Sequence, residues 1–452
     1  MGIDGYFGRE SVAAGGEVSL HVSTEAPRWR ADFFRIGRTT RYAGSTPWLP
    51  GGRAPRPPHP DGIPGRSDPS VDWGWPGHAF TLPESWEPGV YVAFFVTSTE
   101  STFYDPRRLK GPGREYLVVR PRAPRARILY KKSSFTRHAY HRTDGASLYE
   151  DPVYLPGQGH RVSFRRPGGI DDLAWWDAPF LAWLERNGYD VDCCTDLDLH
   201  EDPGLLAPYR LLLSVGHDEY WSADMRTHVE SFVDNGGNAA FLSANTCWWR
   251  VRVVDGGTAF VTDTDHRVGD DYPHLPATDL WWEIAPENAL TGVSFRNGGM
   301  WPGDWPGDRP RDGFAVQHAD HWVFTGTGLR DGDRLGAGTP LIGYECDGAA
   351  FVRDVHGIAR PTGADGTPAT FAILGLAELG PVHDDFHHLR AGHWNCTGRE
   401  TTGPRAATMG VHTRGNGTVF TAATTDWPVV TASGADPAVE RVTRNVLDRL
   451  ST

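Results

Sequence analysis

The most constraining feature of the chain is one stretch, residues 210–252, whose pattern is strand, helix, strand. Leu211–Val215 is a short apolar run, which is typical of a strand covered on both faces. Ser222 can cap a helix whose apolar residues recur on one side. Ala239–Leu242 then predicts a second buried strand. A strand–helix–strand unit of this kind requires two parallel strands.

Polar and aromatic residues follow both predicted strands, at 216–221 and at 243–249. Because parallel strands end at the same edge of a sheet, we expect these two segments to lie close together. In open α/β sheets ligands bind at that carboxyl edge. The sequence therefore predicts the active site there.

Length and charge limit the class of protein. A chain of 452 residues with 57 acidic and 44 basic side chains has a net charge of −13, which argues against a nucleic-acid partner. No apolar run reaches the length of a membrane span, and Met1 leads straight into patterned sequence without a signal peptide. The five scattered cysteines form no zinc pattern and indicate reduced thiols. We expect a cytoplasmic protein with a small-molecule substrate; a homo-oligomer stays open.

Two domains are expected. Alternating strands such as Val18–Val22, and apolar runs such as Val90–Val96, predict an N-terminal β-sandwich over residues 1–124. A Pro- and Arg-rich linker ends it. From residue 125 to 452 strands alternate with helices, which predicts an α/β three-layer domain with its active site at the strand C-terminal ends. The fold class is thus α+β with two domains. A hairpin at 415–417 and a final helix capped by Asp436 close the chain.

Several long blocks resemble the N,N-dimethylformamidase large (beta) subunit family. They are GYFGRESVAAGGEVSLHVST (5–24), FLAWLERNGYDVDCCTDLDLH (180–200) with LLLSVGHDEYW, ADHWVFTGTGLRDGD (319–333), LIGYECDG (341–348), and TVFTAATTDW with DPAVERVTRNVLDRL. The resemblance implies a β-sandwich followed by a domain like the class I glutamine amidotransferases. It also implies an amidohydrolase whose iron is held by two tyrosines and a glutamate.

The iron ligands carry over only in part. The family's tyrosine in its His-x-Glu-Tyr-Trp block matches Tyr220, with Glu219 beside it as the second metal candidate. Where a second tyrosine is expected, this chain has Ala178. The glutamate ligand stays open between Glu283, Glu287 and Glu345. The implied cofactor is Fe(III), and otherwise none. A tyrosinate and a carboxylate are hard oxygen ligands that suit it.

His217, Asp218, Glu219 and Tyr220 place four titratable groups directly after a buried strand. The structural alternative is a helix start whose acidic residues complement the helix dipole. Ordinary turns rarely combine these residue types, so we expect catalytic roles for His217, Glu219 and Tyr220. His217 and Glu219 would form an acid–base pair.

Two further segments would complete the site. In 243–247, Asn245 can orient a carbonyl or donate to an oxyanion, whereas Cys247 is favoured as a buried thiol over a nucleophile. Asp426 ends a later strand and could activate water, or it could cap a helix before Pro428.

Aromatic residues and a His-rich run are the remaining candidates. Substrate-binding roles are predicted for Trp221, Trp248, Trp427 and His387. The run 383–396 is an alternative metal source, although its spacing fits no standard zinc site. The tryptophans suggest a substrate larger than dimethylformamide, such as an aromatic or glycosidic amide.

The sequence thus predicts hydrolysis of an amide or formamide C–N bond in a small or aromatic substrate, through an iron bound by Tyr220 or without one. The first alternative is a metal-free biosynthetic enzyme that uses the His/Glu/Asp cluster on the same scaffold. The second is a carbohydrate- or ligand-binding protein.

Overall fold

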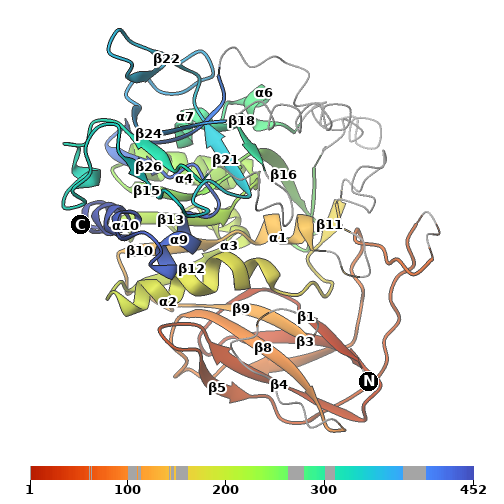
Figure 1. The fold of residues 1–452 in the computed structure, drawn as a ribbon. Helices are drawn as coiled ribbons and strands as arrows, with labels where there is room; N and C mark the ends of the chain where they lie inside the picture. Colours follow the sequence, from red (N-terminus) through yellow and green to blue (C-terminus); the bar gives the residue numbers. More distant parts are fainter. Residues whose placement is uncertain are drawn as a thin grey trace. The chain divides into compact units, whose positions relative to one another are not determined.

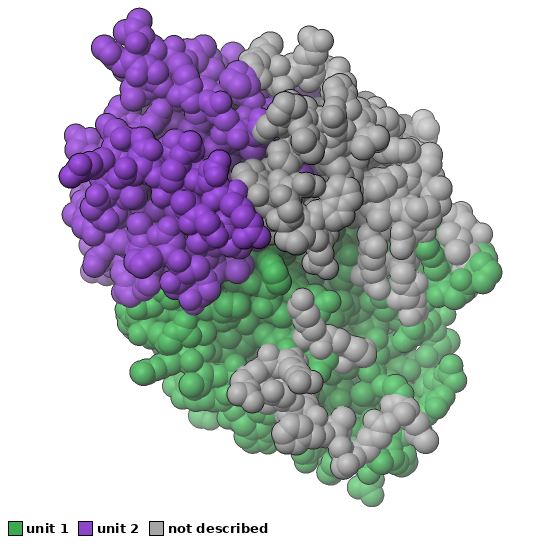
Figure 2. All heavy atoms as spheres, in the orientation of Figure 1, with its two compact units in different colours: residues 1–126, 134–198, 251–262 green, residues 127–133, 199–250, 263–452 purple. Residues whose placement is uncertain are grey.

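The computed structural model describes residues 2–60, 62, 64–99, 109, 113–141, 143, 147–148, 161–262, 279–300, 311–379 and 404–452. The chain divides into two compact units (Figure 2). Unit 1 comprises residues 1–126, 134–198 and 251–262, and unit 2 comprises 127–133, 199–250 and 263–452. No helix in these described ranges is long and apolar enough to cross a bilayer.

Unit 1 contains the expected β-sandwich (Figure 1). One sheet has the order β1 (Ile3–Phe7), β3 (Glu17–Thr24), β7 (Gly77–Thr81). The other has the order β2 (Ser11–Ala13), β9 (Arg114–Arg120), β8 (Gly89–Thr97), β4 (Arg28–Arg35), β5 (Arg41–Ser45), with β6 (Leu49–Pro50) on β4. Leu20 and Val22 from the first sheet share one core with Trp29 and Phe33 from the second. The alternation seen in the sequence is therefore the alternation of core and outer positions.

Unit 1 continues beyond the sandwich. Its other elements are α1 (Ser134–Tyr140), β11 (Arg161–Ser163), a π-helical turn (Leu173–Asp177), α2 (Ala178–Arg186), β12 (Val191–Thr195) and β17 (Ala259–Val261). The boundary expected at residue 124 lies close to the end of the first segment at residue 126. The later segments nevertheless belong to the same unit, because ion pairs such as Arg35–Glu185 and Arg137–Glu115 tie them to the sandwich.

Unit 2 is built on a mixed sheet. Its strands run in the order β10 (Ile128–Lys132), β13 (Leu211–His217), β15 (Asn238–Ala244), β26 (Gly417–Thr421), β25 (Ala406–Arg414), β24 (Ala372–Glu378), β19 (Phe314–Val316), β20 (Arg334–Leu335). The first four strands are mutually parallel, and from β26 onward each strand is antiparallel to its neighbour. His217 is in register with Ala244, so β13 and β15 end together as predicted.

Two helices of unit 2, α4 (Ala223–Asp234) and α10 (Pro437–Leu450), follow the expected signals. The helix α4 starts after Ser222, whose hydroxyl accepts the Met225 N–H at 3.1 Å. It contacts β15 and β26, whereas α9 (Trp427–Ser433) contacts β13 and β15, and α10 contacts β15. The smaller elements of unit 2 are β14 (Tyr220–Ser222), α6 (Trp281–Ile284), α7 (Asn288–Thr291), β18 (Ser294–Met300), a 3₁₀ turn (Trp322–Phe324), β22 (Phe351–Arg353) and β23 (Ala359–Pro361). The residues of α3 (Asp196–Glu201) and β16 (Trp249–Val254) are divided between the two units.

One short strand of unit 2, β21 (Glu345–Gly348), brings the site together. It pairs with β18 and also contacts β15. On its other side it binds the segment after β26: the Thr425 N–H donates to the Glu345 carbonyl at 3.1 Å, and the Asp347 N–H donates to the Ala423 carbonyl at 3.0 Å. β21 therefore lies near the carboxyl ends of the parallel strands.

Candidate active site

The centre of the candidate site is the imidazole of His217, the last residue of β13. Its Nε2 lies 2.7 Å from Glu345 Oε2 and 3.2 Å from Glu219 Oε2, and all three side chains are buried. Two carboxylates thus converge on one nitrogen. Glu219 comes from the segment after β13, and Glu345 comes from β21. The carboxyl edge of the sheet and the strand β21 therefore each supply one carboxylate.

The two carboxylates determine the charge on His217. Burial alone would lower its pKa, but the charge of Glu345 and the hydrogen bond and charge of Glu219 raise the pKa to about 10. The imidazole is therefore protonated at neutral pH. A buried imidazolium between two carboxylates can hold a proton and pass it to an acceptor.

Asp218 points into a separate buried cluster. Its Oδ1 lies 2.6 Å from Lys131 Nζ and accepts the Trp221 indole N–H at 3.0 Å. Its Oδ2 accepts the Ser214 hydroxyl at 2.5 Å, and the Lys131 ammonium lies 4.8 Å from the centre of a Trp221 ring. These contacts fix the segment between β13 and β14, and they occupy both oxygens of Asp218.

The loop after β15 has an unusual backbone. Asn245 and Cys247 have φ values of 48° and 59°, in the left-handed region that non-glycine residues seldom adopt. The Asn245 and Thr246 N–H groups donate to Asp347 Oδ1 and Oδ2 at 2.7 and 3.3 Å. The Trp248 N–H donates to the Glu219 carbonyl at 2.8 Å. The loop is thus bound both to β21 and to the segment that carries Glu219.

Two buried acids near this loop have raised pKa values. Burial raises the pKa of Asp347 to about 8, although its two backbone hydrogen bonds oppose the shift. Burial likewise raises the pKa of Glu287 to about 7. Glu287 accepts a hydrogen bond from the Ser294 hydroxyl.

The predicted residues do not all lie together. Asn245 stands on the loop bound by Asp347, and Asp426 is buried without the side-chain helix cap that was the alternative to a catalytic role. Tyr220 starts β14 and is fully buried. The chemical roles of these three residues stay predictions.

The predicted substrate-binding residues lie in three environments. Trp221 packs on the Lys131–Asp218 pair, and Trp248 lies 5.5 Å from Phe295, centre to centre. Trp427 is a core residue: its indole N–H donates to Thr443 at 2.9 Å, and its ring packs on Phe314 and Phe420. The prediction that residues 424–427 end a strand is wrong, because β26 ends at Thr421 and Trp427 is the first residue of α9. His387 and the run 383–396 lie outside the described residues.

Cys247 behaves as the buried thiol that the sequence favoured. It is fully buried, and burial raises its pKa well above that of a free thiol. The four described cysteines, Cys193, Cys194, Cys247 and Cys346, are all buried, and none of these four is in a disulfide.

Sequence reasoning missed three contributions. Glu345 is only one of three candidate metal ligands in the sequence, and no sequence pattern singled out Asp347 or Lys131. The pair Glu345 and Asp347 in ECDG carried a usable signal, since residues two apart on a strand share a face. Lys131, in a buried strand, was a second signal because a buried lysine requires a partner.

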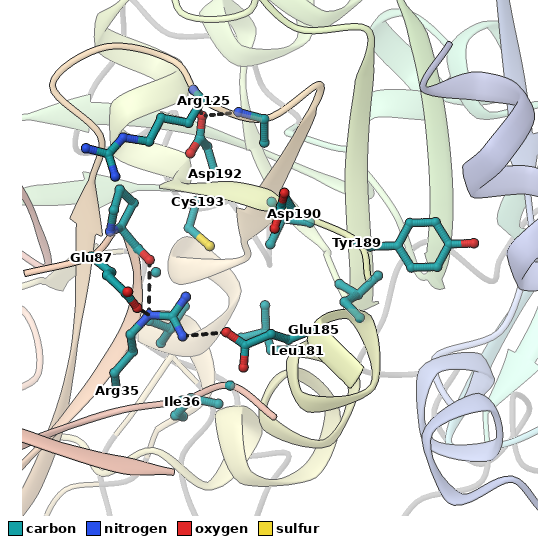
Figure 3. A pocket seen from close by; sticks show the side chains of 17 residues that line it. Arg35, Ile36, Glu87, Arg125, Leu181, Glu185, Tyr189, Asp190, Asp192 and Cys193 are labelled. Carbon is teal, nitrogen blue, oxygen red and sulfur yellow. Dashed lines mark hydrogen bonds and ion pairs between the residues drawn. The ribbon is translucent and has the colours of Figure 1, made fainter. Parts of the chain in front are cut away.

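A cavity of about 350 Å³ lies elsewhere, in unit 1 (Figure 3). The Arg35 guanidinium in its wall binds Glu185 at 2.8 Å and the Pro88 carbonyl at 3.2 Å. Asp192 accepts the Arg125 and Ala126 N–H groups at 2.8 and 3.2 Å. Because these polar groups serve to join segments of unit 1, we do not place the active site there.

Fold and site together define a mixed α/β protein with a buried histidine–carboxylate cluster at the end of parallel strands. The chain belongs to the family described as N,N-dimethylformamidase beta subunit-like, C-terminal, which it matches over residues 35–436. It is 25% identical over 333 residues to an N,N-dimethylformamidase beta subunit of Paracoccus aminophilus and 24% identical over 335 residues to one of Alcaligenes sp.. The matches cover 70% and 71% of this chain but only 42% of each relative.

Proposed function

We propose that the protein hydrolyses a C–N bond of an amide or formamide. The observation that carries this proposal is the convergence of Glu219 and Glu345 on Nε2 of His217. Family membership supports the reaction class, because the relatives are named N,N-dimethylformamidase subunits. The parallel strands of unit 2 are also compatible with the amidotransferase-like fold that we propose for this part of the chain.

Each group has a role in the proposed reaction. A carboxylate of the cluster, or Asp426, takes a proton from water as the oxygen attacks the carbonyl carbon. The imidazolium of His217 gives a proton to the nitrogen as the C–N bond breaks. Asn245 orients the carbonyl and donates to its developing negative charge. The products are a carboxylic acid and an amine, so atoms and protons balance.

The residues do not fit an iron site as they stand. Glu219 and Glu345 offer the oxygen donors that ferric iron prefers, yet both point at the same imidazole nitrogen. Ala178, at the start of α2, offers no ligand atom. We therefore derive no step through a metal, and Fe(III) at Tyr220 and Glu219 stays a prediction.

Metal analysis tests that prediction directly. About one iron per chain, with a visible tyrosinate-to-iron absorption band that Tyr220→Phe removes, would establish the metal. Protein purified with no iron, and no band after incubation with ferric salts, would contradict it.

The hydrolase proposal is tested with a panel of formamides and aromatic amides, by measuring formate or amine release. We expect Glu345→Gln to lower kcat/KM by about 100-fold or more, the range typical of a lost acid–base group. The matched control is Glu378→Gln, because Glu378 is half-exposed on β24 and pairs only with Arg353 in the described contacts. Equal rates for Glu345→Gln and wild type would rule out the proposed role.

A metal-free biosynthetic enzyme is the second candidate, favoured by Ala178 at the position where the family tyrosine is expected. Such an enzyme would use the same His217 cluster, and it would release neither formate nor amine from the formamides and aromatic amides of the panel. A binding protein, the remaining alternative, would show changes in affinity alone when Glu219 is replaced by glutamine.

A further inference from the structure

We propose that Asp347 is a positioning residue that holds the loop after β15 in its active conformation. Its two carboxyl oxygens accept the N–H groups of two consecutive residues, Asn245 at 2.7 Å and Thr246 at 3.3 Å. Asp347 is buried, so water cannot replace these bonds at low cost. The inference rests on the proposed function only for the role of Asn245.

The loop after β15 requires stabilising hydrogen bonds because its backbone is strained. Asn245 and Cys247 are not glycine, yet their φ values are 48° and 59°. A left-handed conformation is unfavourable for a residue with a Cβ atom, for cysteine more than for asparagine. The Asp347 hydrogen bonds act at the first of these two positions and offset part of that cost.

Asp347 also connects the loop to the His217 cluster. Glu345 and Asp347 are two residues apart on β21, so both side chains project to the same side of the strand. One binds His217 at the end of β13, and the other binds the loop at the end of β15. The strand β21 therefore contacts both His217 and the loop that carries Asn245, and it sets the position of one relative to the other.

The Asn245 side chain has capacity left for a ligand. Its Oδ1 is buried and has no hydrogen-bond partner among the described residues. A buried acceptor without a partner is costly, and a ligand N–H that donates to Oδ1 would supply the missing bond while the amide NH2 group donates to the carbonyl. Moving this amide would therefore weaken interactions with the reacting group more than it would weaken the fold.

The first test is hydrogen exchange in wild type, Asp347→Asn and Asp365→Asn. Asp365 is a matched control, since it is a buried aspartate of unit 2 whose Oδ2 accepts a main-chain N–H, that of Ala350 at 2.7 Å. We expect Asp347→Asn to speed exchange in peptides covering 243–249 about tenfold, the effect of one lost hydrogen bond, with no such change in Asp365→Asn. Unchanged exchange at 243–249 in Asp347→Asn would overturn the proposal.

The second test separates positioning from stability. With a panel substrate, kcat of Asp347→Asn should fall about 100-fold while KM changes less than threefold, and Asp365→Asn should keep the wild-type kcat. Faster exchange with an unchanged kcat would overturn the positioning role. If the wild type hydrolyses no amide, the proposed function fails, whereas the exchange experiment still tests the hold on the loop. If Asp347→Asn does not fold, Asp347→Glu takes its place with the same criteria.

Discussion

At the residue scale, the Lys131–Asp218 pair shows how a charged group can be kept inside this protein. Neither side chain is exposed, and Nζ and Oδ1 lie 2.6 Å apart. Ser214 and Trp221 provide further hydrogen bonds to the carboxylate. A buried pair of this kind is tolerated because all its members are satisfied, and its loss of hydration offsets much of its Coulomb attraction.

Removing one member should be far worse than removing both. We expect Lys131→Met to lower the free energy of unfolding by about 3–5 kcal/mol, because Asp218 would stay buried without its cation. The double variant Lys131→Met/Asp218→Asn should recover a substantial part of that loss. Denaturant unfolding of wild type, Lys131→Met, Asp218→Asn and the double variant gives the comparison, and additive losses would show that the two charges do not interact.

At the element scale, the Asp436 side chain caps the start of α10 and also binds a second segment of the chain. Asp436 Oδ1 accepts the Ala438 and Val439 N–H groups at 2.7 and 3.2 Å, as the capping pattern predicts. Its Oδ2 also accepts the Gly336 N–H at 2.8 Å, which ties the helix to the segment after β20. Ser222 at the start of α4 makes only the ordinary cap to the Met225 N–H, with its other contact to His200.

We therefore expect Asp436→Ala to destabilise the protein more than Ser222→Ala does. The ordinary cap is worth about 1 kcal/mol, and the additional buried N–H of Gly336 should bring the cost of Asp436→Ala to about 2 kcal/mol. Thermal and denaturant unfolding measure both. Equal losses would mean that the Gly336 contact contributes nothing.

At the scale of the whole molecule, unit 1 depends on a buried charge network. Arg137 on α1 binds Glu115 on β9 at 2.6 Å and also binds Glu10, while the Tyr116 hydroxyl donates to Glu10 at 2.8 Å. Burial would raise the pKa of Glu10, but His138, Arg137 and Tyr116 lower it to about 2. The network joins the sandwich to the segments that follow the linker.

This lowered pKa predicts acid sensitivity with a definite sign. Between about pH 4.5 and 2 the unfolded chain binds a proton at Glu10 that the folded chain does not, so stability falls as pH falls through this window. Above it the contribution is complete. Glu10→Gln should be less stable at neutral pH and show a shallower decline of Tm on acidification. Glu84→Gln is the control, since Glu84 is an exposed residue of the same unit paired with Arg122; the same pH slope in Glu10→Gln and wild type would contradict the assignment.

Local patterns in the chain were enough for much of the fold. The apolar run at Leu211–Val215, the cap at Ser222 and the run at Ala239–Leu242 predicted a strand, a helix and a second parallel strand, all confirmed. These elements depend on hydrogen bonds and burial within one short segment of the chain. The spacing of apolar residues and the capping residues indicate such local structure directly. The same reasoning placed His217 and Asn245 at one edge of the sheet.

Only the tertiary structure decided which carboxylates meet His217. Glu345 lies more than a hundred residues further along the chain, and the face that it shares with Asp347 does not reveal that this face meets His217. Its position follows from β21 binding the segment after β26, a long-range pairing that leaves no period in the sequence. Likewise Trp427 sits at a predicted strand end, yet packing against Thr443 of α10 turns its ring into the core. The sequence by itself determined the strands and the edge at which they end; long-range packing determined which side chains meet there.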